Sequence, residues 1–386
     1  MVRHDPALPP SRLVGRHPGR EIGIDVRAAV TAIDHPLEIS PSLSKGEDHD
    51  RIPHRDQGES GLGLRGSASR SRRAAANSAT WAFVCLGAAL GCAQGQATPA
   101  ELRAYRDLRG TLVGAETSAA SPRGRYAAHR VRLRSNTGLV ATGRLLRPVA
   151  ARAGCYPAVL LQNGREENSG VIGRLPPEFG DVVVLALDYP EEIPYVIRLR
   201  DVVLHGERLR RAAQQIPARF SLGASYLSQR PDVDTARLAI AATSFAVPFA
   251  TIAAAADHRF RNVALVYGAG DLTSVLAANI VVRPGVLRRP AAWLATRPFA
   301  SFFPERFIGL IAPRPVVMVN GVDDPQMPVK AVERLYRAAR PPKELIWLRT
   351  GHLMPTDSAL IRTLVDTALA RLPVLHAAGD TARCGR

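Results

Sequence analysis

The stretch that decides the fold reads Ala236-Arg-Leu-Ala-Ile-Ala-Ala-Thr-Ser244-Phe-Ala-Val-Pro-Phe-Ala-Thr-Ile-Ala-Ala-Ala-Ala-Asp257. An apolar run typical of a strand leads into Ser244, and an alanine-rich run typical of a helix leaves it. A nucleophilic serine on such a sharp turn needs small residues two positions before and two after it. Here these are Ala242 and Ala246, where glycine is usual. The competing interpretation is a serine that caps a buried helix.

Short apolar runs alternate with helical segments from about residue 125 onward. A turn at Asn136-Thr-Gly138 joins two expected strands. The expected strands span 128–133, 139–146, 156–162, 182–187, 238–242, 263–267, 315–319 and 345–348, and the expected helices span 203–215, 245–256, 329–340 and 357–370. Continuous apolar strands that alternate with helices predict one α/β domain, with a mostly parallel sheet covered by helices on both faces.

A nucleophilic serine also needs a base, which a carboxylate orients. On this kind of sheet the chain order is serine, acid, histidine. Seven of the ten histidines precede Ser244, and His258 follows the Ser244 helix too closely. His352 and His376 remain. We expect His352 to be the base, because it follows the last apolar strand in a loop, whereas His376 lies in the tail.

The acid should follow the preceding strand, where the chain reads Asn320-Gly-Val-Asp-Asp-Pro325. We favour Asp324 over Asp323, and Asp271 is a weaker alternative. A simple Asp-Pro turn is the competing interpretation of this segment.

An oxyanion in the reaction needs two preorganised N–H donors. We expect one from Phe245, directly after the serine. The other is expected from Arg165, in the loop Asn163-Gly164-Arg165 after an apolar strand, where Gly164 allows a close approach to the serine. An ordinary Asn-Gly turn would have the same sequence.

These segments together resemble the α/β-hydrolase family over residues 120–375. The resemblance rests on Ala-Thr-Ser-Phe-Ala at 242–246, Asn-Gly-Arg at 163–165 where the family usually has His-Gly, Val-Tyr-Gly at 266–268, Asn-Gly-Val-Asp-Asp-Pro at 320–325 and Thr-Gly-His at 350–352. The run Leu-Ile-Ala-Pro-Arg-Pro at 310–315 is similar to the dienelactone-hydrolase and acetyl-xylan-esterase branches. The resemblance implies an eight-stranded sheet and a Ser-Asp-His triad.

The hydrolase domain is expected over residues 125–375, and further segments of it should line the substrate-binding cleft. Residues 269–313 are long for a connection, and form either a lid or a helix pair packed on the sheet. Tyr189 is expected to bind substrate together with Asn163 and Gly164. Residues 98–124 are expected to be a linker or an N-terminal helix, and 376–386 a tail.

The N-terminal part differs in character. Residues 1–68 show no periodicity and are expected to be disordered. Residues 69–97 follow the basic, apolar, small-residue order of an export signal, and their apolar run is about half the roughly 20 residues of a membrane-spanning helix. The competing interpretation is a buried helix. Because no methionine lies between Met1 and Met318, we predict a non-AUG start near Leu62 or Leu64.

Two modes of processing fit this signal. Cys92 can be lipidated at a loose lipobox and anchor the protein in a membrane, or cleavage can follow Ala93 or Ala97. Both modes predict an exported protein, either periplasmic, secreted or an outer-membrane lipoprotein. Cys155 and Cys384 then remain, as a disulfide or as two thiols. No cysteine or histidine spacing indicates a metal site.

The charge of the 386-residue chain is strongly basic, with 51 Lys and Arg against 34 Asp and Glu and a formal net charge of +17. Only three of the basic residues are Lys, a skew typical of genome composition. No basic stripe is interleaved with aromatic residues, so we expect no nucleic-acid partner.

The sequence therefore predicts an exported serine hydrolase that cleaves carboxylic esters of small molecules or glycans without a cofactor. An acyltransferase or a peptidase on the same fold is an alternative. The alternative from another class is a catalytically inactive envelope protein, whose arginines bind anionic glycans or lipid headgroups.

Overall fold

The computed structural model describes residues 95–150, 155–164, 168–176, 180–194, 197, 199–354 and 357–376. Its strands are β1 (Leu112–Thr117), β2 (Ser121–Arg123), β3 (Tyr126–Ser135), β4 (Val140–Pro148), β5 (Tyr156–Gln162), β6 (Val183–Leu187), β7 (Val233–Thr243), β8 (Asn262–Val266), β9 (Val316–Gly321) and β10 (Lys343–Leu348). The longer helices are α3 (Pro99–Arg109), α4 (Leu199–Ser228), α5 (Val247–Ala256), α6 (Leu272–Asn279), α7 (Arg288–Thr296), α9 (Val329–Ala338) and α10 (Ser358–Ala370). Short helical turns are η1 (Asn168–Arg174), η2 (Ser244–Ala246), η3 (Gly285–Leu287), η4 (Arg297–Phe302), α8 (Glu305–Ile308) and α11 (Pro373–His376).

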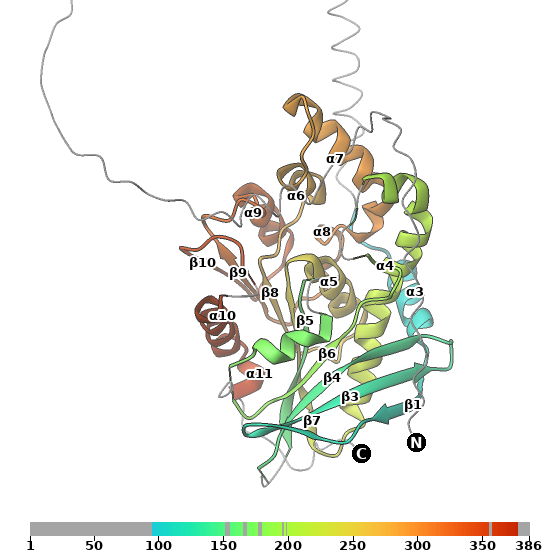
Figure 1. Cartoon of the computed structure of the whole chain (residues 1–386), viewed down its shortest axis with the longest axis vertical. Helices are drawn as coiled ribbons and strands as arrows, with labels where there is room; N and C mark the ends of the chain where they lie inside the picture. Colours follow the sequence, from blue (N-terminus) through green and yellow to red (C-terminus); the bar gives the residue numbers. More distant parts are fainter. Residues whose placement is uncertain are drawn as a thin grey trace, which may run out of the picture.

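All ten strands form one sheet in the order β1-β3-β4-β6-β5-β7-β8-β9-β10, with β2 paired to β3 (Figure 1). The strands from β6 to β10 are parallel to one another, and β1, β3 and β4 add an antiparallel extension next to β6. The chain leaves β5 towards β6 on one side and returns to β7 on the other. In such sheets ligands bind beyond the carboxyl ends of the strands at this switch point.

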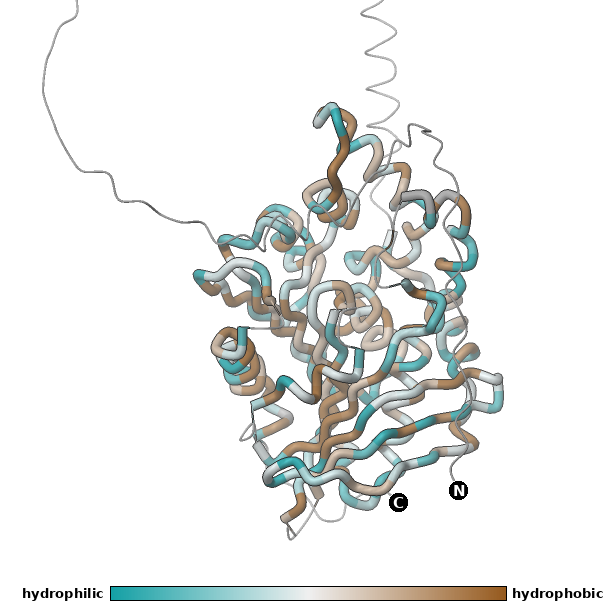
Figure 2. The backbone as a smooth tube through the Cα atoms, viewed as in Figure 1, coloured by the Kyte–Doolittle hydropathy of each residue, from teal (hydrophilic) through white to brown (hydrophobic). Residues whose placement is uncertain are grey.

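Burial follows from these positions in the sheet. All residues of β6, β8 and β9 are buried, as expected for parallel strands covered on both faces. In Figure 2 these central strands form the most hydrophobic part of the trace. Helices α3, α4 and α5 contact one another on one face, while α10 and α11 pack together against the sheet. Every residue of α5 is buried, so the helix that follows Ser244 is fixed within the core.

The antiparallel extension has a different pattern. Along β3, Val131 and Leu133 are buried, whereas the neighbouring Arg130, Arg132 and Arg134 are exposed. Alternation of this kind is typical of a sheet with one face on the core and one in water. The outer face of this extension is therefore polar.

The predicted α/β fold class is confirmed, and the expected strands and helices occur close to their expected positions. The sheet has ten strands rather than eight. The additional strands β1 and β2 lie in 98–124, which we expected to be a linker or helix; α3 is the helix, and the exposed residues of β1 give no apolar signal. Helix α4, which has a kink at His205, extends beyond the expected end at Gln215 and continues through Pro217, a residue type that usually ends or kinks a helix.

Residues 1–94 and 377–386 lie outside the described residues, and so do the predicted disordered segment, nearly all of the export signal and most of the tail. Over the described ranges, no helix has both the length and the apolar character to cross a bilayer.

Candidate active site

Ser244 lies at the sharp turn between β7 and the helical segment η2–α5. Its backbone φ is +53°, in the left-handed region that residues other than glycine rarely adopt. Such a conformation costs of order 1 kcal/mol or more and persists only where the surrounding structure enforces it. The enforcement comes from β7 on one side and the fully buried α5 on the other. The geometry is that of a nucleophile elbow.

The two alanines that replace the usual glycines are both fully buried, at 0% exposure. Neither Ala242 nor Ala246 is among the described residues with a positive φ, and Ala246 has φ −75°. The elbow therefore needs small side chains at these positions, but only Ser244 needs the left-handed backbone. Alanine meets this requirement, so the substitutions do not distort the turn.

His352 faces Ser244 from the loop after β10. The Oγ of Ser244 lies 3.3 Å from Nε2 of His352, and Nδ1 of His352 lies 2.6 Å from Oδ2 of Asp324. The structure thus brings together the three residues predicted from sequence. His376, the alternative base, lies on α11 and its Nε2 contacts the carbonyl oxygen of Leu369.

The carboxylate of Asp324 is held from both sides. Its side chain has 0% exposure, and its second oxygen, Oδ1, accepts hydrogen bonds from the backbone N–H groups of Gln326 and Met327 at 2.7 and 3.3 Å. The residues after Asp324, for which a simple Asp-Pro turn was the competing interpretation, therefore position its carboxylate. A fixed, buried acid of this kind orients the imidazole so that Nε2 faces the serine.

The two alternative acids have different surroundings. Asp323 is exposed. Asp271 caps α6, where its carboxylate accepts hydrogen bonds from the N–H and hydroxyl of Ser274, and it lies 3.7 Å from Arg334. In the part of the chain that the structure describes, neither contacts His352, so the geometry favours Asp324.

Three residues that we did not predict as site residues support the His352 loop. The hydroxyl groups of Tyr267 and Thr350 lie 3.0 Å apart, and the Tyr267 ring lies 5.0 Å from the imidazole. Burial raises the pKa of the Tyr267 phenol, which therefore stays protonated and able to donate. A Cβ on Gly321 would lie 2.3 Å from the carbonyl oxygen of Thr350, so glycine is required for the close approach of this loop to the end of β9.

The opposite wall of the site contains the expected oxyanion loop. Arg165, the expected second donor, lies outside the described residues, so its role stays a prediction, as does that of the Phe245 N–H. The hydroxyl of Tyr189 donates to the carbonyl oxygen of Asn163 at 2.6 Å, which ties this loop to the end of β6. Gly164 differs from expectation: within the described ranges no atom lies within 4 Å of an added Cβ, so close packing is not what selects glycine there.

A row of aromatic rings connects this wall with residues 269–313. Tyr189 contacts Phe245, Phe245 contacts Phe249, and Phe249 contacts Phe302 of η4, with ring centroids 5.4 to 5.7 Å apart in edge-to-face arrangements. Helices α6 and α7 of this segment pack together, and its role as a lid or as a helix pair on the sheet stays a prediction. Phe245, the residue after the nucleophile, is thus connected through aromatic contacts with Phe302 in the segment 269–313.

Two buried amides near the ends of the central strands lack full pairing. Both polar atoms of the Gln162 side chain are buried with no hydrogen-bond partner among the described residues, and the same holds for Oδ1 of Asn320, whose Nδ2 donates to the carbonyl oxygen of Gly268. Each stands at or near the carboxyl end of its strand. Gln162 closes an expected apolar strand, and Asn320 begins the segment expected to carry the acid, so neither was predicted as a site residue.

No cluster of three or more metal-ligating side chains is found in the described part of the chain. Cys155, at the start of β5, is disulfide-bonded, while Cys85, Cys92 and Cys384 lie outside the described ranges, so its pairing with Cys384 stays a prediction.

Comparisons with known proteins agree with this architecture. No protein-family model and no curated protein sequence gives a significant match. Among solved structures, an acetyl xylan esterase from Paenibacillus sp. R4 is similar at a TM-score of 0.53 and 15% identity, over 71% of this chain and 95% of that one. Acetyl xylan esterase 1 from Thermoanaerobacterium sp. JW/SL YS485 is similar at 0.52 and 16%, over 70% and 94%.

Identities this low establish the fold alone. The topology, the elbow at Ser244 and these likenesses lead to one conclusion: the chain has the α/β-hydrolase fold, similar in structure to that of acetyl xylan esterases.

Proposed function

We propose that this protein is a serine hydrolase that cleaves carboxylic esters. The observation that carries the proposal is the chain of contacts from Ser244 Oγ through His352 to the buried Asp324, at 3.3 and 2.6 Å. A serine hydroxyl is a weak nucleophile until a base within hydrogen-bond reach accepts its proton. The left-handed backbone of Ser244 supports the same role, because strain of this kind is retained mainly at functional sites.

The proposed reaction has two stages. Ser244 Oγ attacks the acyl carbon while His352 Nε2 takes the hydroxyl proton, and the alcohol leaves with that proton when the C–O bond breaks. Water then attacks the acyl-serine in the same way and releases the acid. Asp324 holds the imidazolium, and the N–H groups of Phe245 and Arg165 are the proposed donors to the oxyanion.

For the substrate we propose an ester with a small acyl group on a glycan or a small molecule. Support comes from the two structural relatives, which are acetyl xylan esterases by name, and from the bulky rings of Tyr189, Phe245 and Phe249 beside the nucleophile. Such rings restrict the space around Ser244, which favours a short acyl chain.

The test is hydrolysis of p-nitrophenyl acetate and of the longer butyrate and octanoate esters by the full chain. We expect turnover that falls with acyl length, and a loss of at least about 10⁴-fold in kcat for Ser244→Ala. Unchanged turnover in a well-folded Ser244→Ala variant would exclude the proposed nucleophile.

We further propose that the protein is exported. Gly95 to Ala97 already belong to the folded domain: the N–H of Ala97 donates to the carbonyl oxygen of Arg306, and the Ala97 side chain is buried. Processing at Cys92 or after Ala93 leaves these contacts intact, whereas cleavage after Ala97 removes them. The structure therefore favours the first two sites over the third.

A further inference from the structure

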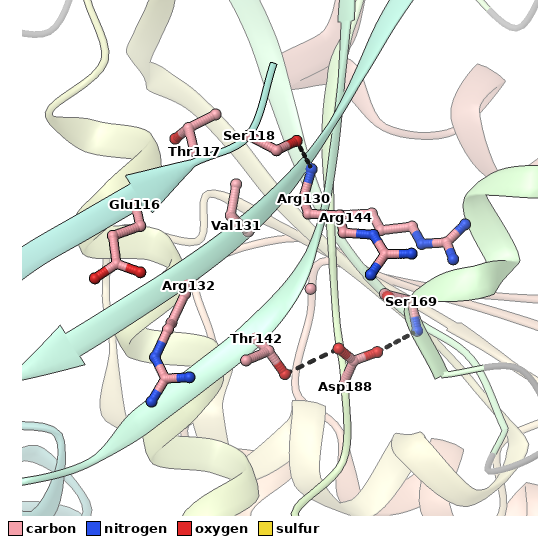
Figure 3. Close-up of a pocket in the computed structure, with 11 residues that line it drawn as sticks. Glu116, Thr117, Ser118, Arg130, Val131, Arg132, Thr142, Arg144, Ser169 and Asp188 are labelled. Atoms are coloured by element: carbon pink, nitrogen blue, oxygen red, sulfur yellow. Dashed lines mark hydrogen bonds between the residues drawn. The ribbon is translucent and has the colours of Figure 1, made fainter. Parts of the chain in front are cut away.

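A cavity opens on the polar face of the antiparallel extension, and no residue of the triad lines it. It has a volume of about 630 Å³, and Figure 3 shows the residues that line it. They are Glu116 and Thr117 of β1 with the following Ser118; Arg130, Val131 and Arg132 of β3; Thr142, Gly143 and Arg144 of β4; Ser169 of η1; and Asp188 after β6. We call this cavity the arginine pocket.

Three arginines of the pocket crowd one face of the sheet. Arg130 and Arg144 are direct partners across β3 and β4, and Arg132 follows two residues along the same face. All three are exposed, and none has a side-chain hydrogen bond or ion pair to any residue that the structure describes. Like charges directly opposite on neighbouring strands destabilise a sheet, so this arrangement calls for an anion between them.

The two carboxylates of the pocket do not supply that anion. Glu116 forms its ion pair with Arg134, outside the pocket, at 3.0 Å. Asp188 accepts hydrogen bonds from the Thr142 hydroxyl at 2.9 Å and from the Ser169 N–H at 3.0 Å, as the dashed lines in Figure 3 show. Among the residues that the structure describes, the three arginines therefore have no ion-pair partner, although the Asp188 carboxylate also lines the cavity.

The remaining lining selects among anionic ligands. Thr117, Ser118 and Thr142 line the pocket, with hydroxyl groups that bond Tyr226, Ala119 and Asp188, and its one large apolar residue, Val131, is only 3% exposed. No aromatic ring is among the lining residues, so nothing there can stack a nucleic-acid base, and no exposed apolar side chain can enter a bilayer. Guanidinium groups with hydroxyls fit a carboxylated, hydroxyl-rich chain such as an acidic oligosaccharide.

The order of the strands gives the spacing between the pocket and the catalytic site. Strand β4 lies three strands from β7, and β3 four, in the order β3-β4-β6-β5-β7. At about 4.8 Å per strand, the arginines lie roughly 14 to 19 Å from the strand that presents Ser244. Asp188, in the pocket, directly precedes Tyr189, whose ring contacts Phe245 next to the nucleophile. A ligand several sugar units long can span this distance.

We propose that the arginine pocket is a subsite for the carboxylates of an acidic oligosaccharide, whose ester group is presented to Ser244. The second half of this statement rests on the proposed ester hydrolysis, whereas the binding of the acidic chain does not. Arg130, Arg132 and Arg144 bind the carboxylates by charge-assisted hydrogen bonds.

The test is calorimetric titration of the full chain carrying Ser244→Ala with oligogalacturonate of about six units. This variant keeps the two questions separate, because binding is measured without turnover. We expect binding that weakens as salt rises, and a Kd about tenfold higher for each of Arg130→Gln, Arg132→Gln and Arg144→Gln. The matched control is Arg103→Gln, which removes the same charge from an exposed position of α3 and should leave Kd unchanged.

Three further probes complete the test: neutral xylohexaose, single-stranded DNA and vesicles with anionic lipid. We expect none of them to depend on the three arginines. The proposal is overturned if oligogalacturonate does not bind, if it binds equally to the Gln variants, or if DNA or vesicles bind through these arginines instead. Hydrolysis of p-nitrophenyl acetate, measured alongside, reports on the proposed esterase independently; the pocket variants should retain it.

Discussion

Nδ1 of His352 lies 2.6 Å from Oδ2 of Asp324, whose side chain is completely buried and also accepts two backbone hydrogen bonds. Replacing Asp324 by Asn keeps the volume but presents an amide to the imidazole, which favours the wrong tautomer. We expect kcat for p-nitrophenyl acetate to fall by about 10³- to 10⁴-fold.

The adjacent Asp323 provides the control for this change. It is exposed, so Asp323→Asn removes the same charge one residue away and should leave kcat within about twofold. If the two variants were equally active, or if Asp323→Asn were the impaired one, Asp324 would not be the orienting acid.

Gly321 controls the position of the catalytic histidine. A methyl group there would lie 2.3 Å from the carbonyl oxygen of Thr350, two residues before His352. Gly321→Ala should push this loop away and lower kcat by about 10²-fold, because displacement of a catalytic group by about 1 Å has effects of this size. Steady-state kinetics measure it, with Gly206→Ala as the control, since an added Cβ at Gly206 meets no atom within 4 Å. A fully active Gly321→Ala enzyme would contradict this packing argument.

The stability of the domain should depend on pH through Asp257 at the end of α5. Burial acts to raise the pKa of this carboxyl group, but the hydrogen bonds and charges of Arg259 and Arg109 lower it below its ordinary 3.8. A lowered folded pKa means that the stabilisation is complete above about pH 4 to 5 and is lost as the pH falls through the folded value.

Asp257→Asn should therefore lower the free energy of unfolding at pH 7 by about 2 kcal/mol, because it removes charge-assisted hydrogen bonds and leaves the partly buried Arg259 and Arg109 unpaired. The loss should shrink below pH 4. Urea titrations at pH 7 and pH 3.5 measure this, with the exposed Asp107→Asn as the control. An equal loss at both pH values would show that the charge is not the cause.

The N-terminus of the mature protein should begin at Cys92 or Gln94. Ala97 is buried and donates to Arg306, and Thr98 caps α3 through a hydrogen bond from the Glu101 N–H. Intact-mass analysis of protein from a cell envelope fraction measures this, with an added lipid mass if Cys92 is modified. A mature chain that begins at Thr98 would contradict it.

Much of this structure could be predicted from the sequence, because the central strands are continuous apolar runs and the elbow has a fixed order of residues. The nucleophile, the base and the acid could be ranked from chain order alone. Strands β1 and β2 could not be predicted, since a largely exposed edge strand shows no alternation of apolar and polar residues. The support from Gly321 also escaped prediction, because it depends on a contact between segments about 30 residues apart.

The elbow alanines show a second limit of sequence patterns. Glycine at both positions is the usual pattern, and its absence suggested an inactive protein. The backbone shows why alanine is sufficient: the left-handed conformation belongs to Ser244, and its small neighbours only have to fit into full burial. A pattern records the residue type, whereas the structure distinguishes a need for small volume from a need for unusual dihedral angles.

The central claim is that Ser244 is an activated nucleophile, and labelling with a fluorophosphonate tests it most directly. Intact-mass spectrometry of the full chain should show one adduct per molecule, located on Ser244 by peptide mapping, with none on Ser244→Ala and a much slower reaction for His352→Ala. Circular dichroism establishes that each variant is folded. A folded wild-type protein that gains no adduct, or gains it at another residue, would contradict the account.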